Sequence, residues 1–398
     1  MKYAIILPDG AADEPVAELD GRTPLEAART PHMDWIAANG RQGLVVTAPD
    51  GFAPGSDVCT LSLFGYDPRQ DYDGRAPIEA AARGLPVGDG EVVFRCNFVT
   101  IHDGRMLDFT AGHISQPEAD RLVADLNAKI GGETCRFFSG VSYRNLLVAG
   151  PPGGFKAKCT PPHDIPDQPI KNHLPTGTGA EWVCAIMERA QAILSEHEVN
   201  HVRRDLGDNP ATDIWLWGHG RPKPLESLGA RFGLRGAAIA AVDLIRGIAL
   251  NAGLHLIDVP GATGYLDTDY AAKGRAAVAA LDEFDLVVVH VEAPDEAGHQ
   301  GNAGAKVAAL ERIDECVVGP LVQRLRGEPR WRVLVAPDHP TPVRTRVHSA
   351  APPPFCLAGH AIQPVVRKPF SEKNASETRF LVDPGRELMA YFIQAGIA

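Results

Sequence analysis

The sequence predicts an α/β fold, in which a mainly parallel sheet is covered by helices on both faces. Several short apolar runs are continuous rather than alternating, which is typical of strands buried on both sides. Helical stretches lie between most of these runs, and this alternation indicates a parallel sheet wrapped by helices. The runs are 3–7, 214–217, 237–242, 286–291 and 332–336, and the helical stretches are 179–194, 244–252, 270–281 and 303–325.

The segment at about 85–175 has a different pattern and predicts an inserted, smaller α+β domain. The runs "EVVFRCNFVTI", "RMLDF", "CRFF" and "YRNLLVA" are bounded by Gly, Pro and Asp-Gly turns, as expected of antiparallel strands, with a helix near 116–130. The stretch 151–169 is rich in turn residues and predicts an ordered loop near a domain boundary. We therefore expect a core domain at 1–84 and 176–398 and an inserted domain at 85–175.

Composition and charge exclude several classes of partner. The formal net charge of −11 leaves no basic stripe for a nucleic acid, and no cationic amphipathic segment indicates a membrane surface. The N-terminus is apolar for only about six residues, too short for a secretory signal, and no run approaches the roughly 20 residues of a membrane span. The seven cysteines include no CxxC pair. We expect a cytoplasmic protein that binds a small metabolite, and leave its oligomeric state open.

Acidic and histidine side chains follow three of the predicted strands, at the point where each strand ends. Because the carboxyl ends of parallel strands meet at one edge of a sheet, where ligands bind, we expect these side chains to lie together. A helix that begins after the strand 286–291 would place Asp295 and His299 on one face. The residues are Asp9 after the first strand, Asp295 and His299 after 286–291, and Asp338, His339 and His348 after 332–336.

These ligands predict a centre with two divalent ions. Six ligands are too many for one tetrahedral ion, and a pair of metal ions is a device for displacing groups at phosphorus. Carboxylates with neutral imidazoles suit Mn²⁺, Zn²⁺ or Co²⁺ better than Mg²⁺ or Ca²⁺. Taken alone, Asp9 before a glycine is an ordinary turn, and Asp338-His339 is an ordinary surface loop. Their coincidence at three strand ends favours a site.

A serine is the candidate nucleophile. The stretch "APGSDVCTLSL" places Ser56 in a turn, before a helix expected to start near Asp57. The N-terminus of a helix offers free N–H groups to a phosphate, and coordination to a metal ion would make the hydroxyl a competent nucleophile at neutral pH. The alternative is that Ser56 only caps the helix, which is the commoner role of an isolated Ser-Asp pair.

Together these motifs resemble the archaeal-type, 2,3-bisphosphoglycerate-independent phosphoglycerate mutases, a branch of the alkaline phosphatase superfamily. The resemblance implies an alkaline phosphatase-like core and a glycolytic isomerase that interconverts 3- and 2-phosphoglycerate through a phosphoserine. It also implies two metal ions, usually manganese, with Mg²⁺ as a further candidate, and a second domain that closes over the substrate. The stretches that carry it are "LPDGAAD", "GSDVCTLSLFGYDP", "ATGYLDTDYAAKG", "HVEAPDEAGHQGN" and "APDHPTP".

The resemblance implies roles for individual residues. Lys273 lies in a motif that the family uses near the transferred phosphate, so it would be catalytic and contact the substrate; its ordinary reading is an exposed helix lysine. One metal ion would be held by Asp295, His299 and His348, and the other by Asp9, Ser56, Asp338 and His339. Candidate substrate contacts on the inserted domain are Arg95, Asn97, Tyr143, Arg144, His163 and Asp164.

Two other functions stay open at this point. The chain departs from the family pattern at Ala351 and at Cys59-Thr60. A bacterial subgroup with the same architecture is a proposed homoserine kinase, so a phosphotransferase of that kind, or a phosphatase, is the alternative enzyme. The absence of a GxxxxGK[ST] loop argues against ATP binding of the usual kind. A non-catalytic regulator would have lost a ligand or the nucleophile, but all seven positions hold competent residues.

Overall fold

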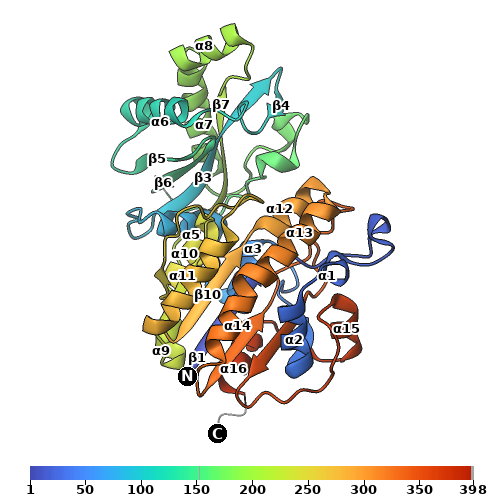
Figure 1. Cartoon of the computed structure of the whole chain (residues 1–398). Helices are drawn as coiled ribbons and strands as arrows, with labels where there is room; N and C mark the ends of the chain where they lie inside the picture. The colour runs from blue at the N-terminus through green and yellow to red at the C-terminus, as the bar shows by residue number, and fades with distance from the viewer. Residues whose placement is uncertain (152, 396–398) are drawn as a thin grey trace. The chain divides into compact units, whose positions relative to one another are not determined.

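A computed structural model describes residues 1–151 and 153–395 of the chain (Figure 1). The chain divides into two compact units. The first unit is discontinuous and consists of Met1–Tyr72 and Pro224–Ala398, whereas the second is the single segment Asp73–Lys223. Each unit has its own sheet and its own apolar core.

The first unit is built on an eight-stranded, mainly parallel sheet, which confirms the predicted fold class. The central strand β1 pairs in parallel with β10 on one side and with β11 on the other. β12 is the exception, because it runs antiparallel to both β11 and β2. In spatial order the strands are β13 (Leu381–Val382), β2 (Arg41–Val45), β12 (Pro354–Gly359), β11 (Trp331–Val335), β1 (Lys2–Pro8), β10 (Leu286–Val291), β8 (Gly236–Ile239) and β9 (His255–Leu256).

Helices cover both faces of this sheet. Alternate residues of β1 point to opposite faces, so Ala4 and Ile6 pack in a core with α2, α11, α13 and α14, whereas Tyr3 contacts Phe392 of α16. Among the described residues no helix is both long and apolar enough to cross a membrane. The helices of this unit are α1 (Pro24–Ala27), α2 (Pro31–Asn39), α3 (Ser56–Leu63), α4 (Pro68–Asp71), α9 (Leu228–Phe232), α10 (Asp243–Asn251), α11 (Tyr270–Glu283), α12 (Ala293–Gln300), α13 (Ala303–Ile313), α14 (Gly319–Leu325), α15 (Glu372–Glu377) and α16 (Glu387–Gln394), with a π-helical turn at Asp314–Val318 between α13 and α14.

The second unit has an antiparallel sheet of five strands packed against helices. Its long central strand β3 pairs with β4, β6 and β7. The elements are α5 (Arg75–Ala82), β3 (Val92–His102), β4 (Arg105–Asp108), α6 (Gln116–Ile130), β5 (Cys135–Val141), β6 (Arg144–Ala149), short 3₁₀ turns at Pro162–Asp164 and Ile170–Asn172, α7 (Ala180–Leu194), α8 (Glu198–Leu206) and β7 (Asp213–Gly220). The four predicted strands and the helix at 116–130 are all present. Apart from Pro152, which lies outside the described residues, 151–169 is mainly loop, as predicted.

One predicted strand belongs to a different sheet. The run 214–217 was expected in the parallel core, but it lies in β7, which pairs antiparallel with β3 of the second unit. The helix α7 packs on β7 and therefore belongs to the same unit. The second unit thus extends beyond the expected 85–175 at both ends. The error has a physical reason: β7 is buried along most of its length, so its sequence has the continuous apolar pattern of a parallel strand.

Candidate metal centre

The three acids predicted at strand ends come together at one edge of the first unit's sheet. Asp9 directly follows β1, Asp295 lies in the first turn of α12 after β10, and Asp338 follows β11. The three strands are neighbours, in the order β11-β1-β10. All three carboxylates are buried, with 0%, 4% and 1% of each residue exposed, respectively. The geometric part of the prediction, convergence at one edge, is confirmed.

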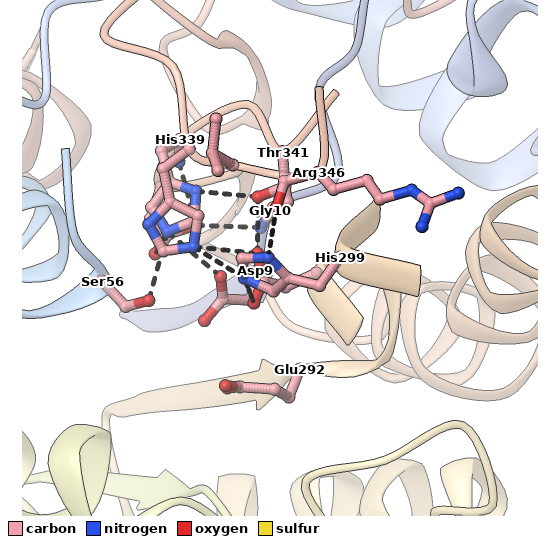
Figure 2. A network of polar contacts seen from close by, with 12 residues as sticks. Asp9, Gly10, Ser56, Glu292, His299, His339, Thr341 and Arg346 are labelled. Atoms are coloured by element: carbon pink, nitrogen blue, oxygen red, sulfur yellow. Dashed lines mark hydrogen bonds and ion pairs between the residues drawn. The ribbon is translucent and has the colours of Figure 1, made fainter. Parts of the chain in front are cut away.

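Gly10 makes this close approach possible. Its φ of +61° is in the left-handed region that favours glycine. A Cβ atom at this position would lie 2.5 Å from Asp295 Oδ1 and 2.6 Å from Thr341 Oγ1, so any side chain would separate these groups. The Gly10 N–H donates a hydrogen bond to Asp338 Oδ1 (3.1 Å) (Figure 2). The Asp-Gly turn therefore brings the ends of β1, β10 and β11 together.

The first cluster consists of Asp295, His299 and His348. Helix α12 places His299 four residues after Asp295, and the distance from its Nε2 to Asp295 Oδ2 is 3.1 Å. His348 Nε2 lies 3.4 Å from Asp295 Oδ1 and 3.0 Å from His299 Nε2. The main-chain carbonyl of Arg346 lies 2.9 Å from His299 Nδ1, so an Nδ1–H donates to it and the Nε2 atom faces the cluster (Figure 2).

The electrostatics of this cluster are dominated by the contact between a carboxylate and the imidazoles. Burial alone would raise the pKa of Asp295, but the hydrogen bonds from His299 and His348 lower it well below its usual range. The bond to Asp295 raises the pKa of His299 to about 9. Asp295 is therefore ionised at neutral pH, as a metal ligand must be.

The second cluster contains Asp9, Asp338, His339 and the candidate nucleophile. His339 Nε2 lies 3.5 Å from Asp9 Oδ1, 3.4 Å from Asp338 Oδ2 and 3.1 Å from Ser56 Oγ. The ring of His339 stacks on that of His348, with centroids 3.9 Å apart, so the two clusters are adjacent. The seven predicted ligands therefore gather in one place within the first unit.

Ser56 is the first residue of α3 and does not cap it. The N-cap is Gly55, and the Ser56 hydroxyl contacts His339 instead of the helix backbone. The capping alternative is therefore wrong for the hydroxyl. Figure 2 shows the Ser56 side chain pointing toward His339, at the border of the second cluster.

The donor set of the second cluster fits divalent cations. Asp9 Oδ1 and Asp338 Oδ2 are buried and have no hydrogen-bond partner among the described residues. Burial and the charges of Asp338 and Asp295 raise the pKa of Asp9 well above its usual range. Buried, unpartnered carboxylate oxygens are costly unless a proton or a cation satisfies them. Oxygen and imidazole donors at these spacings would serve as ligands of such a cation.

Two residues near this centre were not predicted. His290 and Glu292 belong to or directly follow β10, and together with Asp9 they form a third group whose ligand atoms could hold an ion. His290 Nε2 lies 2.8 Å from Asp9 Oδ2 and 3.5 Å from Glu292 Oε2. Burial and the charge of Asp9 raise the pKa of Glu292. The sequence feature that could have pointed to His290 is a histidine inside an otherwise apolar strand, "LVVVHV".

Lys273 is buried and not exposed, so its ordinary reading as a surface lysine is wrong. It lies on α11, and its Nζ donates to the carbonyl of His290 (3.2 Å). Burial lowers the pKa of Lys273 to about 8, and the charge of Glu292 acts in the opposite direction. Its predicted contact with a phosphate stays a prediction.

Three of the predicted substrate contacts on the second unit, Arg95, Asn97 and His163, gather around Trp217. Its Nε1–H donates to Asn97 Oδ1 (3.1 Å), and the guanidinium of Arg95 lies 4.5 Å from its ring centroid. The ring of His163 lies 5.0 Å from the same indole. Arg144 pairs with Asn97 across β3 and β6, and Asp164 follows His163 on the 3₁₀ turn.

Electrostatic interactions also connect the predicted substrate contacts. Burial lowers the pKa of His163, and the charges of Arg95, Arg75 and Arg144 act in the same direction. Arg75 was not predicted; its Nε lies 3.1 Å from Glu79 Oε1. The sequence feature that could have pointed to Arg75 is its position directly after a glycine at the start of α5.

Comparison with known proteins gives one consistent result. A family model described as 2,3-bisphosphoglycerate-independent phosphoglycerate mutase matches residues 37–200. A protein of that name from Methanothrix thermoacetophila is 50% identical over 394 residues, which cover 99% of this chain and 100% of the relative. Another from Methanosarcina acetivorans is 48% identical over 358 residues, 90% of each chain.

Solved structures are similar over nearly the whole chain. A protein from Pyrococcus horikoshii has a TM-score of 0.83 at 28% identity, with 99% of this chain and 96% of that chain covered. The cofactor-independent phosphoglycerate mutase from Thermoplasma acidophilum has a TM-score of 0.67 at 26% identity, with 99% of both chains covered.

Proposed function

The chain belongs to the family of 2,3-bisphosphoglycerate-independent phosphoglycerate mutases, which are isomerases, and we propose that it interconverts 3- and 2-phosphoglycerate through a phosphoserine at Ser56. The observation that carries the proposal is the position of the Ser56 hydroxyl. It lies 3.1 Å from His339 Nε2, at the border of a cluster whose buried carboxylate oxygens lack partners. A nucleophile beside a candidate cation site is the arrangement that phosphoryl transfer needs.

The reaction has two halves that use the same serine. In the first, Ser56 Oγ bonds to the phosphorus while the bond to the O3 atom of glycerate breaks, and the released hydroxyl gains a proton to match the one that serine loses. In the second, the O2 hydroxyl of the reoriented glycerate takes the phosphoryl group back, and the serine is regenerated. His339 Nε2 orients the Ser56 hydroxyl for this exchange.

We propose that the cofactor of this centre is a pair of divalent ions, with Mn²⁺ as the preferred metal. When bound, they would neutralise the phosphoryl oxygens and lower the pKa of a coordinated hydroxyl. The buried oxygens without partners and the imidazole donors support this assignment. One ion would be held by Asp295, His299 and His348, and the other by Asp9, Ser56, Asp338 and His339.

Substrate binding is proposed for the second unit. Arg95 and Arg144 suit a phosphate or carboxylate because a guanidinium donates two parallel hydrogen bonds. The clustering of Arg95, Asn97 and His163 around Trp217 supports a common site. Closure of this unit over the substrate, the contact of Lys273 with the phosphate and a location in the cytoplasm stay predictions.

Replacement of the nucleophile tests the proposal. We expect S56A to lower kcat by at least about 10³-fold, because no other described hydroxyl contacts His339 Nε2. Metal content and melting temperature should stay close to those of the wild type. Activity is measured with 3-phosphoglycerate in an enolase-coupled assay, and phosphorylation of Ser56 by mass spectrometry of the quenched enzyme.

Assays of the same purified protein distinguish the alternative activities. Product with homoserine and ATP, but none with 3-phosphoglycerate, would overturn the mutase in favour of the kinase. Release of inorganic phosphate without 2-phosphoglycerate would indicate a phosphatase. Retained mutase activity in S56A would contradict the phosphoserine mechanism.

A further inference from the structure

Thr341 lies between the two clusters of the candidate metal centre. It follows Asp338-His339 by two residues and is fully buried. Its Oγ1 lies 2.5 Å from Asp295 Oδ1, in the first cluster, and 3.2 Å from His339 Nδ1, in the second (Figure 2). No other described side chain has a hydrogen bond to both clusters in this way. Its role is not explained by the proposed set of ligands.

Hydrogen-bond chemistry determines in which of its two contacts the Thr341 hydroxyl donates and in which it accepts. A hydroxyl carries one proton and can accept at its lone pairs, whereas an ionised carboxylate can only accept. Thr341 therefore donates to Asp295 Oδ1 and accepts from an Nδ1–H of His339. With the proton on Nδ1, the Nε2 atom of His339 carries the lone pair, and this is the atom that faces Ser56 Oγ and Asp9 Oδ1.

The backbone of Thr341 is held from two sides. Its carbonyl accepts a hydrogen bond from Lys306 Nζ (2.9 Å), and its N–H donates to the carbonyl of Ala12 (3.2 Å). Lys306 is itself buried and paired with Asp13 (2.7 Å). Lys306 Nζ also donates to the carbonyl of Ala12 (3.2 Å), so all three of its protons have partners. Loss of the bond to Thr341 would leave a buried N–H donor without a partner, and this cost holds the Thr341 carbonyl in place.

The side chain of Thr341 is also fixed by packing. A Cβ atom at Gly298 of α12 would lie 2.8 Å from Thr341 Cγ2, so the helix meets the threonine methyl directly at this glycine. With Cγ2 against α12, rotation about χ1 would drive the methyl or the hydroxyl into a neighbouring group. The hydroxyl is thus confined between Asp295 and His339.

We propose that Thr341 is a positioning residue that couples the two halves of the metal centre. Because one hydroxyl orients a ligand of each cluster, filling of one cluster fixes the geometry of the other. The inference rests on the proposed metal centre, and adds to it that the two ions bind cooperatively. Outer partners of metal ligands commonly contribute 10–100-fold to affinity.

The test is metal binding to the metal-free full-length protein. Mn²⁺ alone is titrated by calorimetry into the wild type, T341V and T341S. Valine matches the shape of threonine without the hydroxyl, and serine keeps the hydroxyl. We expect two ions per wild-type chain, a weakening of about 10–100-fold at both sites in T341V, and affinities within about threefold of the wild type in T341S.

Two controls separate coupling from general damage. T345V changes an exposed threonine on the same loop, whose Oγ1 donates to the carbonyls of Pro342 and Val347 and has no hydrogen bond to either cluster among the described residues, so this variant should bind Mn²⁺ as the wild type does. Removal of a ligand by H299A disables the first cluster. In the H299A protein only the second cluster can bind Mn²⁺. Adding T341V should weaken this binding less than T341V weakens it in the intact protein, because the part of its effect that depends on the first cluster is already lost.

The outcomes are distinct. Two ions bound by T341V with wild-type affinity would overturn the coupling and leave the metal centre intact. A wild-type protein that binds no Mn²⁺ would overturn the metal centre itself, and the coupling with it. Weakening in T341V that T341S restores, at unchanged melting temperature of the metal-free proteins, supports the proposal.

Discussion

The two oxygens of Asp9 face different neighbours. Oδ2 lies 2.8 Å from His290 Nε2, whereas Oδ1 lies 3.5 Å from His339 Nε2 and lacks a hydrogen-bond partner among the described residues. His290 thus orients the carboxylate and leaves Oδ1 turned toward the second cluster. Asp9 was predicted from its place after a strand, but His290 was not, because a histidine inside a buried strand reads as part of the core.

Glu372 provides a residue-scale prediction on stability. Its carboxylate accepts hydrogen bonds from the N–H of Asp13 (3.0 Å) and the hydroxyl of Thr23 (2.7 Å), and burial raises its pKa to about 7 from the ordinary 4.5. Between pH 4.5 and 7 the folded protein keeps a proton that the unfolded chain has released. Stability is therefore lost as pH rises through this window, by at most about 1.4 kcal/mol per pH unit.

The variant E372Q should remove this dependence. We expect its urea midpoint to fall less steeply than that of the wild type between pH 5 and about 7. Glu377 lies on the same helix, and a bond to Lys368 lowers its pKa, so E377Q should keep the wild-type slope in this window. Equal slopes for E372Q and the wild type would show that Glu372 does not titrate there.

At the scale of elements, the site depends on how α12 meets the loop after β11. The helix begins two residues after β10, so Asp295 and His299 project from its first and last turns. Contact between the helix and the loop is close because Gly298 lacks a Cβ atom, which would lie 2.4 Å from the carbonyl oxygen of Thr341. The i, i+4 spacing was visible in the sequence, whereas the need for Gly298 became visible only in the packing.

A single methyl group at Gly298 should therefore displace the helix. We expect G298A to lower stability by about 1–3 kcal/mol and to weaken Mn²⁺ binding, as measured by thermal unfolding and calorimetry. G304A is the matched control on the next helix, because the nearest atom to its Cβ would be Asn302 Oδ1 at 3.7 Å. That substitution should be neutral or stabilising by up to about 1 kcal/mol. Similar losses in both variants would contradict the packing argument.

At the scale of the whole molecule, the second unit is continuous in sequence and has its own sheet and core. Its central strand β3 pairs with β7, which lies beyond residue 175, and α5, which lies before residue 85, packs on both strands. A fragment that ends at the boundaries expected from the sequence would lose these elements, and the part of β3 from Val93 to Val99 would lose its pairing with β7.

These boundaries can be tested with two fragments. We expect residues 73–223, expressed alone, to unfold cooperatively with urea and to show the circular dichroism of a folded α+β domain. The shorter fragment 85–175 should lack cooperative unfolding, because it is without α5, α7 and β7. Cooperative unfolding of the shorter fragment would show that the sequence-based boundaries define an independent domain.

The sequence by itself determined the fold class, the convergence of Asp9, Asp295 and Asp338, and the family to which the chain belongs. These features are local: a buried strand is recognised by its continuous apolar run, and the parallel order of strands sends their ends to one edge. The tertiary structure alone decided which sheet the strand β7 joins, and that Thr341 connects the two clusters. Strand pairing and side-chain bridges are contacts between residues distant in sequence, and no local pattern specifies such a partner.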